Sequence, residues 1–378
     1  MPSNDFPSTP TLGTTPQIRL PKEQAGLPIK PGQGYFRVRL HAAQAAIFGP
    51  FWQKAEQLAV TSEVRLYCPP FEGTPLQSLQ RIRPLRQGAP EQLGLSPNLV
   101  DLVPASFEKL SIAIEFLLDR RNRLVDLAKL ANDDAFISVI SLAPGAAAVA
   151  KAITMLTRKI LTAFMDENDQ QPVLKFSGDF SLPAGDLADA YYVILGSRYD
   201  QYPLPRPLPG PPRLQVQGRD LVYDGQPVLG WSYVILDVDT VEARTKDLGR
   251  GEPWYARLDE VDVLANQMKN NPFVTMKSRK ETWGKCLNLI KDADALLRVA
   301  PMYLPVEAQA IIQQAYLETY EKIFQVQRNV FEMLPELIDF GGENFLKVAS
   351  EDDLKGQVST YRKQQANSRL KLKQMGLL

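Results

Sequence analysis

The apolar residues of this chain follow two different periods, and the change from one to the other lies near residue 251. Before it, apolar and polar residues alternate in short runs bounded by Gly, Pro or Asp, a pattern typical of half-buried strands. After Gly251-Glu252-Pro253, apolar residues recur every three or four positions, as they do in amphipathic helices. The alternating strand and helix rhythm of a doubly wound sheet is missing, so we expect an α+β fold.

The expected β-rich domain covers residues 35–250. We predict a mostly antiparallel, sandwich-like domain with helices inserted near residues 120–165. Strands are expected to start at Tyr35 and to follow at residues 60–67, 111–118, 136–142, 173–180, 190–195, 214–216, 221–223 and 231–243. Six prolines fall in the last ten residues of segment 202–212, which favours a rigid loop. An exposed segment of this kind can also dock into an aromatic groove.

The N-terminal region, residues 1–34, differs from the rest of the chain in its proline content. It holds seven prolines and little apolar patterning, which predicts an extended or disordered arm outside any core. Such an arm can be a free tail, or it can become ordered when it lies along a neighbouring subunit.

Residues 252–378 are expected to form a helical region. Its apolar stripes begin at Trp254, Met276 and Ile312, and the stripe of the last helix consists of Leu354, Val358, Tyr361 and Leu372. From Leu354 to Leu378 there are six basic side chains and no acid. The candidate partner contacts on this basic helix are Arg362, Lys363, Arg369, Lys371 and Lys373. The alternative is a solvated face that complements the helix dipole.

Composition excludes several classes of function. With 43 Lys+Arg and 43 Asp+Glu, the chain has no net positive charge to attract nucleic acid over a distance. Tyr361 is the only ring of the basic helix, so we expect no sequence-specific nucleic-acid binding. Cys68 and Cys286 belong to no C-x-x-C pair, which favours a reduced, cytoplasmic setting. The first residues do not have the pattern of a secretory signal.

Catalytic machinery is scarce in the sequence. The single histidine, His41, lies on the arginine-bearing face of the strand from Tyr35, together with Arg37 and Arg39. General base catalysis and zinc sites both rely on imidazole, and no serine elbow or phosphate-binding glycine loop is recognisable. We therefore interpret His41 as a surface or interface residue, and we expect no enzyme and no cofactor.

Asp237 and Asp239 are the metal-ligand candidates of the sequence. They alternate along the long strand 231–243, so both carboxylates project from one sheet face and can share a hard cation. A metal-assisted hydrolase that uses these two acids is one hypothesis. Two acids matched to Arg or Lys on the next strand are the commoner arrangement.

Residues 136–164 provide a second hypothesis. The most apolar stretch of the chain, residues 135–150, has sixteen residues without a charge, but Pro144-Gly145 interrupts it and it is too short to span a bilayer. The amphipathic helix expected at its end has Val149, Ile153, Leu156 and Ile160 on one side. This helix can pack on the sheet, enter a partner groove, or lie in an anionic membrane surface as part of a membrane-active protein.

The favoured hypothesis is a non-enzymatic protein–protein interaction or assembly protein, such as a scaffold or structural subunit. In it, the β-rich domain is the scaffold, while the N-terminal arm and the helical C-terminal region bind a protein partner or further copies of the chain. This interpretation rests on the single imidazole and on the missing signatures of a nucleophile or a phosphate cradle.

Overall fold

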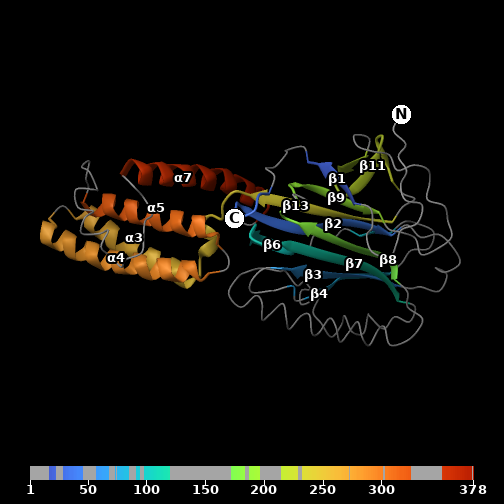
Figure 1. The fold of residues 1–378 in the computed structure, drawn as a ribbon, viewed down its shortest axis with the longest axis horizontal. Helices are drawn as coiled ribbons and strands as arrows, with labels where there is room; N and C mark the ends of the chain where they lie inside the picture. The colour runs from blue at the N-terminus through green and yellow to red at the C-terminus, as the bar shows by residue number, and fades with distance from the viewer. Residues whose placement is uncertain are drawn as a thin grey trace. The chain divides into compact units, whose positions relative to one another are not determined.

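The computed structural model shows a fold of two compact units. It describes residues 17–22, 29–45, 57–67, 73, 75–84, 91–93, 98–119, 172–183, 187–195, 214–228, 232–271, 273–300, 303–324, 351–376 and 378. We call Met1–Gly32 with Phe36–Thr240 the β unit, and Gln33–Tyr35 with Val241–Leu378 the helical unit. Mostly antiparallel sheets and C-terminal helices confirm the expected α+β class (Figure 1).

Three sheets make up the β unit. The order of the first is β1 (Gln17–Pro21), β9 (Ala190–Leu195), β13 (Tyr233–Val241), β2 (Tyr35–Ala45) and β5 (Glu91–Leu93), with β6 (Asn98–Pro104) also paired to β2. The order of the second is β4 (Leu76–Pro84), β3 (Gln57–Leu66), β7 (Lys109–Asp119) and β8 (Pro172–Ser181). The smallest contains β10 (Leu214–Gln217), β11 (Asp220–Tyr223) and β12 (Gln226–Pro227).

Side chains from different sheets meet in the core of the β unit. Phe180 of β8 packs edge-on against Tyr192 of β9, with ring centroids 5.5 Å apart, so the second sheet contacts the first. One core cluster joins the first sheet to the smallest one and consists of Leu20, Ala42, Val193, Leu214, Leu221, Tyr233 and Ile235. All nine residues of β13 are buried, which places this strand in the interior of the unit.

Residues of the N-terminal region form strand β1 of the β unit. It pairs antiparallel with β9, and Leu20 is only 1% exposed. This segment does not form the arm outside any core that the prolines predict. Its apolar residues Ile18 and Leu20 alternate with polar residues at the period of a strand, between Pro16 and Pro21. Proline is compatible with β1 because this strand lies at the edge of its sheet.

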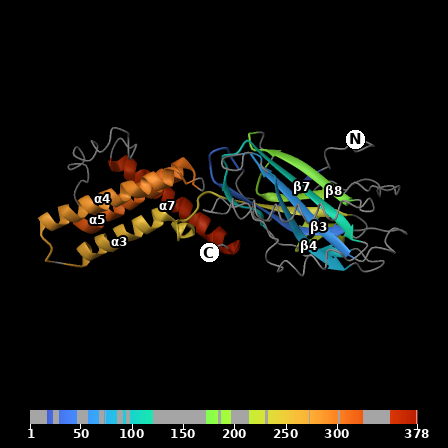
Figure 2. The same cartoon turned by 90° about the horizontal axis from the view of Figure 1, so that it is seen from below.

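The helical unit contains the 3₁₀ helix η3 (Lys246–Gly249) and the helices α3 (Pro253–Asn270), α4 (Met276–Arg298), α5 (Pro305–Phe324) and α7 (Glu351–Gln374). Pro253 suits the first turn of α3, where a backbone N–H has no partner within the helix. The Thr275 hydroxyl caps α4 by accepting a hydrogen bond from Ser278 N at 3.2 Å. Helices α3, α4 and α5 pack against one another, and α7 packs on α5 (Figure 2).

The apolar stripe predicted for the last helix is confirmed, because Leu354, Val358, Tyr361 and Leu372 are all buried. Other expectations lie outside the described residues: the inserted helices at 120–165, the strand at 136–142, the loop at 202–212 and the third helix beyond residue 324. Within the described residues, none of the helices has the length and apolar character needed to cross a membrane.

Candidate functional site

Six charged residues of the β unit form a compact group that we call the charge cluster: Lys22, Arg37, Arg39, Asp189, Asp237 and Asp239. Lys22, which directly follows β1, lies at its centre. Its Nζ atom is 3.0 Å from Asp189 Oδ1, 2.6 Å from Asp237 Oδ1 and 2.7 Å from Asp239 Oδ1. Three cations therefore face three carboxylates in a largely buried setting, which keeps the cluster electrically balanced.

Strand β2 supplies the two guanidinium groups of the charge cluster. Arg37 Nη2 donates to Asp239 Oδ2 at 2.7 Å, while Arg39 forms ion pairs with both Asp237 and Asp239. Burial opposes ionisation of Asp239, but the charges of Lys22 and Arg37 outweigh it and lower the pKa of this carboxyl to about 2. Burial also opposes the charge on Lys22, yet Asp239 and Asp237 raise its pKa above the ordinary value.

The spacing of Asp237 and Asp239 thus has a structural explanation. The two acids are matched to arginines of β2, which is paired with β13 in the first sheet, and Lys22 Nζ lies within ion-pair distance of both. Among the described residues, no group of three or more His, Cys, Asp or Glu side chains could hold a metal ion. The charge cluster needs no metal ion to account for its two aspartates.

His41 makes structural contacts within the β unit. Its Nε2 atom lies 2.6 Å from the carbonyl oxygen of Gly218, in the β10–β11 turn, and its ring lies against Tyr191 with centroids 5.2 Å apart. An imidazole in these contacts connects strand β2 to the small sheet.

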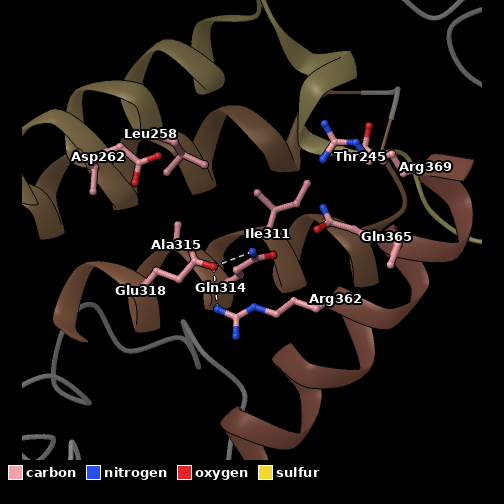
Figure 3. A pocket seen from close by; sticks show the side chains of 12 residues that line it. Thr245, Leu258, Asp262, Ile311, Gln314, Ala315, Glu318, Arg362, Gln365 and Arg369 are labelled. Carbon is pink, nitrogen blue, oxygen red and sulfur yellow. Dashed lines mark hydrogen bonds and ion pairs between the residues drawn. The ribbon is translucent and has the colours of Figure 1, made fainter. Parts of the chain in front are cut away.

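A groove of about 360 Å³ lies between α3, α5 and α7 in the helical unit (Figure 3). Its apolar wall is formed by Leu258 and Val261 of α3, Ile311 and Ala315 of α5, and Ala366 of α7. Leu258, Val261 and Ile311 are buried, and the two alanines leave space beside them. The volume falls in the range of about 300–1,000 Å³ that is usual for ligand pockets.

Polar side chains form one rim of this groove. Arg362 of α7 lies 2.7 Å from Glu318 of α5, and Gln314 donates to the same carboxylate oxygen at 2.8 Å (Figure 3). On α3, Asp262 pairs with Lys322 at 3.2 Å. The acids that line the groove therefore already have cationic partners within the unit.

The end of the groove near the start of η3 is rich in hydrogen-bond donors. Ala243 N donates to Ser368 Oγ at 3.0 Å, so α7 is held against the segment that follows β13. Two residues after Ala243, Thr245 lines the groove, and Arg369 and Gln365 line it from α7 (Figure 3). Thr245 Oγ1 is buried and has no hydrogen-bond partner in the part of the chain that the structure describes.

A buried carboxyl group fixes α7 to α5 beside this groove. Glu307 of α5 accepts a hydrogen bond from Tyr35 Oη, and Tyr361 Oη of α7 lies 3.4 Å from the same carboxyl group. Tyr35 Oη also accepts a hydrogen bond from Leu304 N at 3.0 Å. Burial raises the pKa of Glu307 to about 8, although hydrogen bonding by Tyr35 and the charge of Arg244 act in the opposite direction.

The structure brings together only part of the predicted partner-binding set. Arg362 and Arg369 line the groove, whereas Lys363 and Lys373 are exposed on α7 outside it and Lys371 is half-buried. The predicted contacts Val149, Ile153, Leu156 and Ile160 lie outside the described residues.

Sequence reasoning missed two residues of the helical unit. Glu307 lies five positions before Ile312, off the apolar stripe predicted for this helix, so no local pattern marked it. Thr245 was not marked either, because its environment depends on how α7 folds back over the segment after β13.

Comparison with models of known protein families gives no match, and none of the curated proteins matches the sequence. The residues and their geometry therefore carry the functional proposal.

Proposed function

We propose that this protein is a non-enzymatic interaction or assembly protein that binds a protein partner, or further copies of itself, mainly through its helical C-terminal region. The observation that carries the proposal is the groove between α3, α5 and α7, which combines an apolar wall with the predicted contacts Arg362 and Arg369. Apolar grooves between helices with a polar rim are a common way to bind a partner helix.

Fewer residues of the N-terminal region are available for partner binding than its proline content predicts. Gln17–Pro21 form β1, and Lys22 belongs to the charge cluster, so these residues hold the β unit together. We therefore assign binding by the arm to residues 1–16. The free cysteine Cys286 is buried in α4, which is consistent with the reduced, cytoplasmic setting that we propose.

Removal of the whole last helix is a poor test of this function, because it would expose the core residues Leu354, Val358 and Leu372. A large side chain placed in the groove is a cleaner change. Ala366 lines the groove and is exposed, whereas the next residue, Asn367, is exposed and does not line it. Trp at either position leaves the buried stripe of α7 in place.

The test compares the full chain with its Ala366→Trp and Asn367→Trp variants in self-association and in recovery of partners from the cell of origin. We expect Ala366→Trp to abolish the association and Asn367→Trp to preserve it, with unchanged circular dichroism for both. Equal association by all three proteins would show that the groove is not the binding surface.

A further inference from the structure

The turn between α3 and α4 exposes large apolar side chains to solvent. Figure 2 shows that this turn joins the ends of two helices that lie side by side. Phe273 in the turn is 91% exposed, and Met276, the first residue of α4, is 60% exposed. We call Phe273, Val274 and Met276 the apolar tip. Apolar side chains that gather at one exposed place mark a contact surface for a protein or a membrane.

Hydrogen bonds hold the turn in one conformation. Phe273 N donates to Asn271 Oδ1 at 3.0 Å, and the Thr275 hydroxyl caps α4. Arg279 of α4 donates to the carbonyl oxygen of Ile323 near the end of α5, so a third helix supports the same end of the hairpin. Because the turn is ordered before binding, little conformational entropy is lost when the apolar tip makes a contact.

Positive charge surrounds the apolar tip. The part of the sequence between Asp262 and Glu281 contains no acid. It contains four basic residues: Lys269, Lys277, Arg279 and Lys280. The three lysines are exposed, whereas Arg279 is half-buried. A contact surface that combines apolar side chains with lysines favours an anionic partner.

The acids at this end of the hairpin do not cancel the positive charge. Asp262 pairs with Lys322 of α5 at 3.2 Å. Glu281 of α4 and Glu321 in the last turn of α5 are exposed carboxylates. Four basic residues against these two acids leave a positive surplus around the apolar tip.

The order of apolar and basic residues along the hairpin matches the layers of a lipid surface. Phe273 lies in the turn, beyond the ends of both helices, whereas Lys280 lies one turn into α4, about 6 Å along the helix axis from Met276. Lysine side chains can keep their apolar stems near the hydrocarbon and extend their charge to the headgroups. A protein partner would have to supply a cavity for Phe273, whereas the boundary between headgroups and acyl chains accepts an apolar side chain directly.

We propose that the apolar tip binds this protein to an anionic membrane surface. Phe273 and Met276 insert at the boundary between headgroups and acyl chains, and Lys269, Lys277 and Lys280 contact lipid phosphates. None of these residues lines the groove between α3, α5 and α7, so the proposal goes beyond the proposed function and does not depend on it.

Flotation of the full chain with lipid vesicles tests the proposal. Phosphatidylcholine vesicles are compared with vesicles that also contain about 30% phosphatidylserine, at several salt concentrations. We expect about tenfold stronger binding to the anionic vesicles, and a preference that decreases as salt screens the charges. A chain that does not float with the anionic vesicles would overturn the proposal.

Phe273→Ser combined with Met276→Ser removes the large apolar side chains of the tip. The control combines Val299→Ser with Val306→Ser, because these side chains are 78% and 73% exposed and Val299 lies at the other end of α4, about 35 Å along the helix axis. We expect the tip variant to bind anionic vesicles about tenfold more weakly and the control to bind as wild type. Equal binding by both would show that another part of the chain contacts lipid, and would overturn the proposal.

Charge reversals separate the tip from the overall charge of the chain. Lys277→Glu with Lys280→Glu changes two lysines beside the tip, and Lys363→Glu with Lys373→Glu makes the same change at exposed positions of α7. We expect only the first variant to lose the preference for anionic vesicles, with unchanged circular dichroism for both. Equal losses would show that the overall charge alone attracts the chain to lipid, and would overturn the proposal.

Phe273→Trp measures insertion directly. The tryptophans Trp254 and Trp283 are buried, so an indole at the tip adds an exposed fluorophore to the emission of the wild-type chain. We expect lipids brominated on their acyl chains to quench this added emission, and to leave the emission added by Val299→Trp unchanged. Absence of quenching at position 273 would show that the tip does not enter the lipid, and would overturn the proposal.

The groove variant Ala366→Trp keeps this proposal distinct from the proposed function. We expect it to float with anionic vesicles as wild type does, even where it loses association with a protein partner. If Phe273→Ser with Met276→Ser instead loses a protein partner and keeps its binding to vesicles, the apolar tip is a protein contact and the membrane proposal fails.

Discussion

Glu307 shows how one buried side chain can link the stability of the helical unit to pH. The ordinary pKa of its carboxyl group is 4.5, and burial in the folded protein raises it to about 8. Between these values the folded protein holds a proton on Glu307 that the unfolded chain releases. The stabilising contribution of this proton is therefore complete below about pH 4.5 and is lost as pH rises towards 8.

We predict that Glu307→Gln removes this pH dependence while keeping the shape of the side chain. Wild type should lose stability relative to the variant as pH rises from 4.5 towards 8, by up to about 5 kcal/mol. Chemical denaturation at a series of pH values measures the difference. Glu321→Gln, at an exposed position of the same helix, is the control and should behave as wild type. Parallel pH profiles for wild type and Glu307→Gln would contradict the prediction.

Lys22 balances the charge cluster, so its removal should be costly. Lys22→Met keeps the length of the side chain but leaves three buried carboxylates facing two guanidinium groups. An uncompensated buried charge of this kind destabilises a protein by about 3 kcal/mol or more. Urea unfolding should show this loss, with Lys30→Met at an exposed position as the control.

A second change checks that charge balance is the cause. Asp189→Asn in the Lys22→Met background restores equal numbers of cations and carboxylates, and should recover part of the lost stability. If Lys22→Met unfolds at the same urea concentration as wild type, the cluster contributes little to the fold.

The sequence predicted the shared face of Asp237 and Asp239 but not their partners. Alternation along a strand is a local property, and it placed both acids correctly. Lys22 is more than 200 positions away in the chain, and only the pairing of β1 with β9 brings it to the same place. Such contacts depend on topology, which the local pattern does not specify.

At the scale of elements, the junction between η3 and α3 depends on a small residue. A Cβ atom at Gly249 would overlap the indole ring of Trp254 and would lie 2.9 Å from Tyr303 Oη. Trp254 and Tyr303 pack edge to face, with ring centroids 5.3 Å apart. Close packing in this corner leaves no room for a methyl group.

We predict that Gly249→Ala destabilises the protein by about 1–3 kcal/mol, because the added methyl group forces the indole ring to move. Gly284→Ala on α4 is the matched control: nothing lies within 4 Å of the new atom, and alanine favours the helix by about 1 kcal/mol. Thermal unfolding followed by near-UV circular dichroism should show opposite shifts for the two variants. An unchanged melting temperature for Gly249→Ala would mean that the side chains around Gly249 are loosely packed.

Helices with a clear apolar stripe were easier to predict than strands without alternation. The stripe of α7 was predicted residue by residue, whereas β6 was missed. Five of the seven residues of β6 are buried, and a continuous apolar run carries no period that marks a strand. Strand β1 was missed for a different reason, since Pro16 before it and Pro21 at its end suggested an arm instead of an edge strand.

At the scale of the molecule, the change of period at residue 251 indicated two parts, but the boundary between the units differs from it. The helical unit begins at Val241, the last residue of β13, and also includes Gln33–Tyr35. Within this unit Tyr35 donates a hydrogen bond to Glu307, which lies 272 positions further along the chain. A contact between residues so far apart is not visible in the local pattern.

The central claim is that this chain acts by binding other protein molecules. Light scattering after size exclusion measures it most directly, on the purified chain alone and on the complex recovered from its own lysate. We expect a mass above the 42.3 kDa of a single chain in at least one of the two samples. A mass of 42.3 kDa in both samples, with no bound partner, would contradict it.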